Sequence, residues 1–363
     1  MTHTRAVGIV SIALSVSLVM AGCAVNEQIG PGASDSRITG TLVGAGSSAL
    51  GAAQNSWIAG FQTAHPRANV TYDPTGSGAG REAFAGGGTD FAGTDRAFST
   101  EELDGAVEFR GCAVDSGVVQ LPLYISPIAV IFRLEGIDSL NMSADVIAGI
   151  FAERITDWSD PAIAELNPET TLPELAITPV HRSDDSGTTE NFTDYLAQAA
   201  PTVWSFEADG VWPLDSGEAA QGTSGVVDAV SNGVGTIGYA DASRAGDLGI
   251  VSVGVGDEFV PYSPEAAAAI VDASPTVEGR PDFDLSLELD RDTTASGVYP
   301  IVLVSYLVAC ERYTDPVKAE LVAEYFRYMA STEGQLVAQD GAGSAPISDA
   351  LFLRVSAAIE AIS

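Results

Sequence analysis

The residues that could do chemistry gather most densely in the segment His181–Thr189, which reads HRSDDSGTT. Arg182 offers a planar fork of N–H donors, and the hydroxyls of Ser186 and Thr188 supply further donors. A helix that begins here would add unpaired backbone N–H groups and a partial positive charge. The segment therefore predicts a site for a small anion, and we call residues 181–189 the anion loop.

Two other Gly/Ser turns have the same character, residues 44–49 (GAGSSA) and 75–80 (TGSGAG). Each follows a β-rich run and precedes a stretch with helical spacing. Glycine allows positive φ and close backbone approach, so the N–H groups of such turns can point towards a ligand. We expect the three turns to converge on one anion.

The elements that must position these turns alternate between strand and helix. Short strands are predicted at 40–43 and 70–72, and apolar residues at helical spacing run from 50 to 61 until His65-Pro66 ends the helix. Trp57, Phe61 and Trp158 are expected in the core. This alternation is typical of an α/β fold.

Two long β-rich runs, 118–132 and 298–308, are good crossing points between two lobes. The apolar run 301–309, which overlaps the second, is predicted to be a buried strand. Lobe I would then comprise residues 37–123 plus 295–363, and lobe II residues 124–294. In open α/β sheets ligands bind at the carboxyl ends of strands, so a shared ligand is expected in the cleft between the lobes.

The amino terminus predicts export. Arg5 precedes an apolar run from 6 to 19, which is too short for a permanent membrane span, and Met20-Ala21-Gly22-Cys23 follows. We interpret 1–22 as a lipoprotein signal peptide, Cys23 as the lipidated residue and 23–36 as a tether that begins with it. The alternative is a plain secretory signal with an incidental cysteine. About 327 residues remain, enough for two ordinary domains.

The net charge of −33, with Lys318 as the single lysine, excludes the basic surface that nucleic-acid binding needs. An anion site in such a chain must work through donors at contact distance, because charges beyond roughly 8–10 Å are screened at physiological salt. The acidic run 282–292 is expected to be a solvated connection. Cys112 and Cys310 remain after Cys23 is set aside, and they could form a disulfide or stay as two buried thiols.

Five motifs in order carry a resemblance to a known family. They are GAGSS at 44–48, GSG at 76–78, GTD at 93–95, RSDDSGT at 182–188 and GTIGY at 235–239, supported by ITDW at 155–158 and LNP at 166–168. Together they resemble the PstS-type phosphate-binding proteins, the extracytoplasmic receptors of the ABC-type phosphate importer. The resemblance implies a two-lobed periplasmic-binding-protein fold of class II with the ligand in the interlobe cleft.

The resemblance also implies a ligand set. The phosphate-binding residues would be Ser48, the N–H of Ala49, Ser77, Asp95, Arg182, Ser186, Gly187 and Thr188. Asp184 would hold the arginine fork in place, and His181 receives no ligand role. Ala49 departs from the family, which often has Phe there, and this removes an aromatic ring while keeping the N–H.

Asp95 would set specificity. An ionised carboxylate can only accept, so it favours a ligand that still carries a proton, such as HPO4 or H2PO4, over fully ionised sulfate. Arsenate carries the same proton and remains the alternative ligand.

Each residue also has a simpler role. Ser48, Ser77 and Ser186 could be helix N-caps, Asp95 a turn residue and Arg182 a surface cation paired with a neighbouring aspartate. With all five motifs in order, ligand binding is favoured. A serine phosphatase is less favoured, because no Gly-x-Ser-x-Gly elbow occurs and only His65 and His181 follow the signal. We expect no catalytic residue, metal or cofactor.

The resemblance implies partners and a location as well. The expected partners are inorganic phosphate, an ABC phosphate permease and a membrane reached through the anchor at Cys23. The expected protein is a monomer on the outer face of the cytoplasmic membrane.

Overall fold

The computed structural model describes residues 38–363. The predicted signal peptide, the predicted lipidation site Cys23 and the predicted tether all lie outside the described residues. Among the described helices, none combines the length and apolarity that crossing a bilayer requires.

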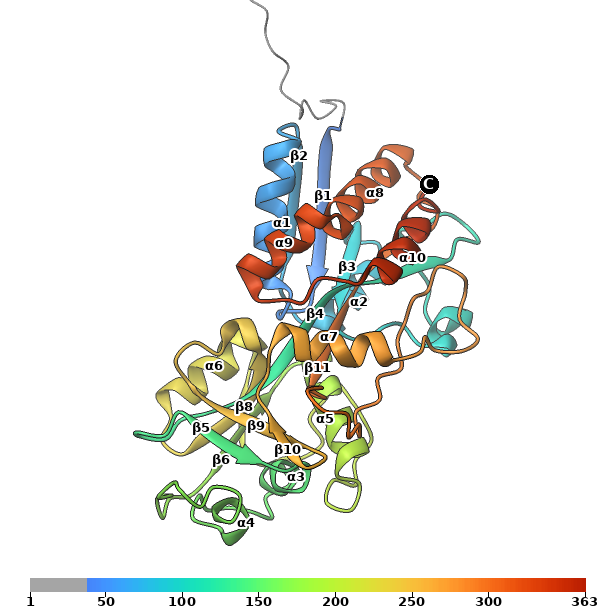
Figure 1. Ribbon diagram of the computed structural model, residues 1–363. Coiled ribbons are helices and arrows are strands. Elements are labelled where there is room, and N and C mark those ends of the chain that lie inside the picture. Colours follow the sequence, from blue (N-terminus) through green and yellow to red (C-terminus); the bar gives the residue numbers. More distant parts are fainter. Residues whose placement is uncertain (1–37) are drawn as a thin grey trace, which may run out of the picture. The chain divides into compact units, whose positions relative to one another are not determined.

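One mixed sheet organises the described chain (Figure 1). Its hydrogen-bonded order is β2-β1-β3-β11-β4-β8-β6-β7, and β9 pairs with β4, β5 and β10. The strands are β1 (Gly40–Gly46), β2 (Ala68–Asp73), β3 (Phe91–Thr94), β4 (Val118–Phe132), β5 (Ser139–Met142), β6 (Thr178–Arg182), β7 (Glu218–Ala220), β8 (Thr236–Asp241), β9 (Gly249–Val255), β10 (Glu258–Val260) and β11 (Val302–Cys310).

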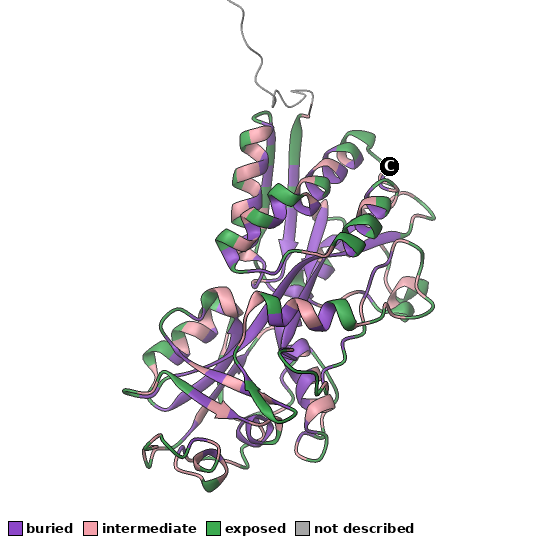
Figure 2. Ribbon diagram, in the orientation of Figure 1, coloured by how far each residue is buried: buried purple, intermediate pink, exposed green. Residues whose placement is uncertain are grey.

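Helices lie along the sheet and turn one side towards it, so that strands are largely buried while the outer helix faces are exposed (Figure 2). The α-helices are α1 (Gly51–Ala64), α2 (Ser77–Ala85), α3 (Ala144–Phe151), α4 (Pro161–Ala164), α5 (Gly187–Ala199), α6 (Gly222–Asn232), α7 (Pro264–Ala273), α8 (Pro316–Ala330), α9 (Thr332–Ala342) and α10 (Asp349–Ile359). A π-turn at Glu102–Ala106 and a 3-10 turn at Ala242–Arg244 complete the helical elements. The predicted α/β fold is confirmed.

Strand β4 joins the two ends of the sheet. All fifteen of its residues are buried; its first part pairs antiparallel with β11 and its last part, from Ile128, pairs with β8. The register shifts between Ser305 and Tyr306, where β11 passes Pro122. Proline lacks the N–H that a regular ladder needs, and a bulge accommodates it. We call β2, β1, β3 and β11 the first half-sheet, and β5–β10 the second half-sheet.

The predicted elements near the first turn are confirmed in outline. The strand predicted at 40–43 runs on through Gly46, so the glycine turn is the end of β1 itself. The predicted helix is α1, which ends at Ala64 with the N–H of His65 donating to the Phe61 carbonyl at 2.8 Å, just before Pro66. Trp57, Phe61 and Trp158 are fully buried, as expected of core residues.

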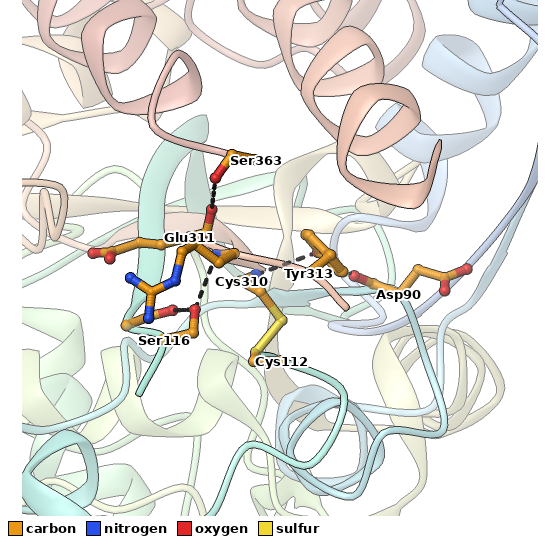
Figure 3. The surroundings of a disulfide bond; sticks show 9 residues. Asp90, Cys112, Ser116, Cys310, Glu311, Tyr313 and Ser363 are labelled. Carbon is orange, nitrogen blue, oxygen red and sulfur yellow. Dashed lines mark hydrogen bonds between the residues drawn. A yellow bond between two sulfur atoms is a disulfide. The ribbon is translucent and has the colours of Figure 1, made fainter. Parts of the chain in front are cut away.

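Cys112 and Cys310 form a disulfide, with their Cα atoms 5.4 Å apart (Figure 3). Cys310 ends β11, and its N–H donates to the hydroxyl of Tyr313 at 3.3 Å. The same hydroxyl donates to the carbonyl of Asp90 at 2.6 Å, just before β3. The bridge therefore links the segment between the π-turn and β4 to the end of the strand that runs through the middle of the sheet.

The expectation that the acidic run 282–292 is a solvated connection is wrong at several of its positions. Asp284 and Arg291 are 4% and 2% exposed. The Asp284 carboxylate accepts from the side-chain amide of Gln120 at 2.8 Å and from the guanidinium of Arg280 at 3.0 Å. The local acidity did not indicate this burial: Arg280, four residues before Asp284, neutralises its charge, and the second partner, Gln120, lies 164 residues away in β4.

Candidate functional site

The anion loop connects the end of β6 to the start of α5, as its sequence predicts. Arg182 is the last residue of β6, and Ser186 is the N-cap of α5, its Oγ accepting from the N–H of Thr189 at 3.2 Å. The first turn of α5 therefore begins directly beside Arg182. Its unpaired N–H groups and helix dipole favour negative charge at this place.

The guanidinium of Arg182 is held as a fork by Asp184. Nε donates to Oδ1 at 2.8 Å and Nη2 donates to Oδ2, while Oδ1 also accepts from the N–H of Gly222 at 3.0 Å. Burial alone would raise the pKa of Asp184, but the hydrogen bonds and charge of Arg182 outweigh it and the pKa is lowered. The alternative role for Arg182 was a surface cation paired with a neighbouring aspartate; the pair with Asp184 is present, but Arg182 is only 3% exposed and is not a surface cation.

The carboxylate of Asp95 is the second centre of the site. It is 4% exposed and accepts from three hydroxyls: Ser305 on Oδ1 at 2.7 Å, and Ser47 and Thr188 on Oδ2 at 2.7 and 3.3 Å. Burial raises the pKa of Asp95, while these hydroxyls and the charge of Arg182 oppose the rise. Asp95 is thus a buried acceptor near a cation, and the alternative role of a turn residue does not account for it.

Backbone contacts hold Asp95 between the two half-sheets. Its N–H donates to Ser77 Oγ at 3.2 Å, and its carbonyl accepts from Asn191 Nδ2 at 2.8 Å. A Cβ on Gly187 would lie 2.6 Å from Asp95 Cβ and 2.8 Å from Ser77 Oγ. Only glycine lets the start of α5 approach the second turn and Asp95 so closely.

The first turn lies against α6. Ser48 Oγ is 2.9 Å from Thr223 Oγ1 and accepts from the N–H of Thr223 at 3.1 Å. The N–H of Ala49 donates to Ser47 Oγ at 3.1 Å. Gly46 has φ 146°, and a Cβ there would lie 1.8 Å from the Gly93 carbonyl oxygen. The turn therefore packs directly on the end of β3, next to Asp95.

The predicted residues thus come together from three turns and both half-sheets. Of the three serines for which capping was the alternative, Ser186 is an N-cap, while α1 and α2 have no side-chain cap. His181 stacks on Trp212 with ring centroids 5.1 Å apart, and its Nδ1 lies 2.9 Å from the Arg182 carbonyl oxygen. No group of three metal-ligating side chains occurs within residues 38–363.

Four residues of the cluster were not predicted: Ser47, Asn191, Thr223 and Ser305. Ser305 had a usable signal, because it is a polar residue inside the apolar run 301–309. The expected hydroxyl donor of the first turn is Ser48, whereas the hydroxyl that reaches Asp95 belongs to its neighbour Ser47. Nothing local distinguishes Asn191 and Thr223, whose partners lie 96 and 175 residues away.

Cavity size does not locate this cluster. A cavity of about 1120 Å³ is lined mainly by 133–138 and 169–175 and contains none of the residues of this cluster. A cavity of about 330 Å³ lies along Arg182, Asp184 and Asp185. The site is therefore recognised by its converging donors rather than by the volume of a pocket.

Comparison with known proteins agrees with this geometry. Residues 31–333 match the family model described as PBP superfamily domain. Phosphate-binding protein PstS 3 of Mycobacterium tuberculosis is 33% identical over 377 aligned positions, which cover 98% of each chain. The chain belongs to the PstS family of phosphate-binding proteins.

A further relative and a solved structure extend the match. Phosphate-binding protein PstS of Methanocaldococcus jannaschii is 30% identical over 299 positions, covering 77% of this chain and 75% of that one. The solved structure of PfluDING, a high-affinity periplasmic phosphate-binding protein bound with phosphate, has a TM-score of 0.68 at 21% identity, covering 88% and 93% of the two chains. The predicted two-lobed periplasmic-binding-protein fold is confirmed by this likeness.

Proposed function

We propose that this protein captures inorganic phosphate between its anion loop and Asp95 and delivers it to an ABC-type phosphate permease. The observation that carries the proposal is the pairing of a buried acceptor, Asp95, with a buried cation, Arg182, whose fork is fixed by Asp184. Such a pair suits an oxyanion that is both negatively charged and protonated. Family membership supports the same reading.

The proposed ligand set is Ser48, the N–H of Ala49, Ser77, Asp95, Arg182, Ser186, Gly187 and Thr188. Hydrogen bonds to charged groups contribute about 1.5–3 kcal/mol each, so several of them can offset the desolvation of a divalent anion. The site would bind its ligand without covalent chemistry, a metal or a cofactor. Arsenate, which has the same charge and proton, is the second candidate, because Asp95 would accept from it equally well.

We propose that lobe I comprises 37–123 plus 295–363 and lobe II 124–294. Ligand capture would then involve motion of the lobes about β4 and β11. We also propose that residues 1–22 are removed, that Cys23 carries lipid, and that the protein acts as a monomer at the outer face of the cytoplasmic membrane. An apolar anchor there would keep the receptor close to its permease.

Calorimetric titration tests the proposal. The chain from residue 24, stripped of bound anions, is titrated with phosphate, arsenate and sulfate near neutral pH. We expect one-to-one binding of phosphate and no heat with sulfate. A folded, anion-free protein that gives no heat with phosphate would overturn the proposed function.

Asp95→Asn tests the specificity. The amide can donate to sulfate, so we expect it to bind sulfate more tightly than the parent and phosphate more weakly. A variant that binds sulfate no better than the parent would contradict the role of Asp95. The same titrations on Ser47→Ala, which removes one hydroxyl donor but keeps the carboxylate, serve as the matched control.

A further inference from the structure

Arg96, directly after Asp95, connects the first half-sheet to the anion loop and to α5. Its Nη2 contacts both carboxylate oxygens of Asp185, at 3.1 and 3.3 Å, and its Nη1 lies 3.0 Å from Oε2 of Glu190. Arg96 follows β3 in the first half-sheet, whereas its partners belong to the anion loop and to α5. One guanidinium therefore holds both ends of the turn that carries the anion donors.

Asp185 is seated between two glycines. The N–H of Gly78 donates to the Asp185 carbonyl at 3.2 Å, and a Cβ on Gly78 would lie 2.4 Å from Asp185 Oδ2. A Cβ on Gly210 would lie 2.2 Å from Oδ1. Any side chain at either position would displace the carboxylate from Arg96. The local backbone thus leaves room for this contact from both sides.

The backbone of Arg96 is fixed as well. Its carbonyl accepts from Arg81 Nη1 at 2.9 Å, and Arg81 in turn pairs with Glu102. The side chain of Arg96 is 25% exposed, and those of Asp185 and Glu190 are 40% and 26% exposed. One such pair would contribute little alone, but a single cation shared by two anions on a fixed backbone acts as a network.

We propose that Arg96, Asp185 and Glu190 form a clamp that holds the anion loop against Asp95 and slows release of the bound oxyanion. In this role Arg96 is a positioning residue, acting through the loop. The inference rests on the proposed function. It adds a determinant of ligand residence time that lies outside the proposed ligand set.

A different role for Arg96 makes the opposite prediction. If Arg96 only attracted the anion through its charge, removing the nearby carboxylate of Asp185 would leave more positive charge by the ligand and tighten binding. If the clamp operates, removing the same carboxylate loosens the loop and speeds release. Asp185→Asn therefore separates the two roles by the sign of its effect.

The experiment measures phosphate dissociation and association rates by rapid mixing, together with melting temperature. The variants are Arg96→Gln, Asp185→Asn, Glu190→Gln and the double variant Arg96→Gln/Asp185→Asn. Arg110→Gln is the matched control, because Arg110 pairs with Glu108 on the surface, where both side chains are at least 70% exposed. Gly210→Ala keeps every charge but displaces the Asp185 carboxylate.

We expect Arg96→Gln and Asp185→Asn each to raise the dissociation rate about three- to tenfold, Glu190→Gln to raise it less, and the double variant to match the larger single effect. Gly210→Ala should follow Asp185→Asn, and Arg110→Gln should equal the parent. Slower or unchanged release in Asp185→Asn, or single effects that multiply in the double variant, would overturn the clamp. A parent protein that binds no phosphate would instead refute the proposed function.

Discussion

Two buried arginines of this protein have contrasting hydrogen-bond arrangements. Arg291, in the acidic run, is 2% exposed and has most of its donors engaged. Nε donates to Asp194 at 2.6 Å, Nη1 donates to the carbonyls of Pro300 and Val302 at 3.1 and 3.0 Å, and Nη2 donates to Asn191. Its guanidinium joins α5 to the start of β11 through hydrogen bonds.

Arg182, in the anion loop, is almost as buried, yet its side chain donates only to Asp184 among the described residues. A guanidinium has five N–H donors. Asp184 uses the Nε edge, so both N–H groups of Nη1 and one of Nη2 keep donor capacity. Arg182 and Arg291 are almost equally buried, so the difference between them is the donor capacity that the described partners of Arg182 leave unused.

The largest expected effect comes from Arg182→Ala. Because two charge-assisted hydrogen bonds to the ligand would be lost, the dissociation constant for phosphate should rise about 100-fold or more. Calorimetry with phosphate measures the change, and a thermal melt confirms folding. An affinity within threefold of the parent would contradict a ligand-binding role for Arg182, which would then be a structural residue like Arg291.

Arg291→Met should lower the stability of the protein and leave its phosphate affinity nearly unchanged. The change leaves Asp194 and two buried carbonyls without their donor, so the free energy of unfolding should fall by about 3–5 kcal/mol. Phosphate affinity of the folded protein should change far less than in Arg182→Ala. Urea unfolding and calorimetry on the same samples test both statements. A stability equal to the parent's would contradict the structural role of Arg291.

Two buried carboxyl groups, those of Asp95 and Asp241, also differ in their surroundings. Asp95 lies near Arg182, whereas Asp241, at the end of β8, accepts from the hydroxyl of Tyr124 at 3.1 Å and from the N–H of Ser243 at 3.0 Å. Burial raises the pKa of Asp241 to about 6, from the usual 3.8. The folded state therefore holds this proton more tightly than the unfolded chain does.

The stability that this carboxyl contributes should therefore fall as pH rises through this range. The contribution of Asp241 to stability is complete below about pH 4 and declines as pH rises to about 6, by at most about 3 kcal/mol. Asp241→Asn cannot ionise, so its stability relative to the parent should increase by up to that amount between pH 4 and pH 7. Parallel unfolding curves at several pH values measure the difference; a constant difference would show that Asp241 does not titrate in this range.

Local patterns were sufficient for much of this protein. The anion loop was predictable because a strand end, an N-cap serine and a helix start are encoded by neighbouring residues. The buried strand β11 was predictable because its apolar run leaves few alternatives. The resemblance to the PstS-type proteins implied Asp184 as the partner of Arg182, and the two side chains form an ion pair.

Other parts depended on contacts between distant segments. Ser305 reaches Asp95 from 210 residues along the chain, through a strand whose register is set by pairing with β4. The acidic run was expected to be solvated from its carboxylates alone, whereas Gln120 and Asp194, which are distant in sequence, contact Asp284 and Arg291 in the folded protein. Arg96 had no predicted role, because its carboxylate partners, Asp185 and Glu190, come from a distant part of the chain.

The sequence by itself determined the family, the anion loop and the types of donor and acceptor in the site. These depend on residue identity and short spacing, which are written in the chain directly. Only the tertiary structure decided which donors remain available and which residues support them. That depends on how each side chain's hydrogen-bonding capacity is divided among partners from several strands and helices, and the division exists only once those elements have packed together.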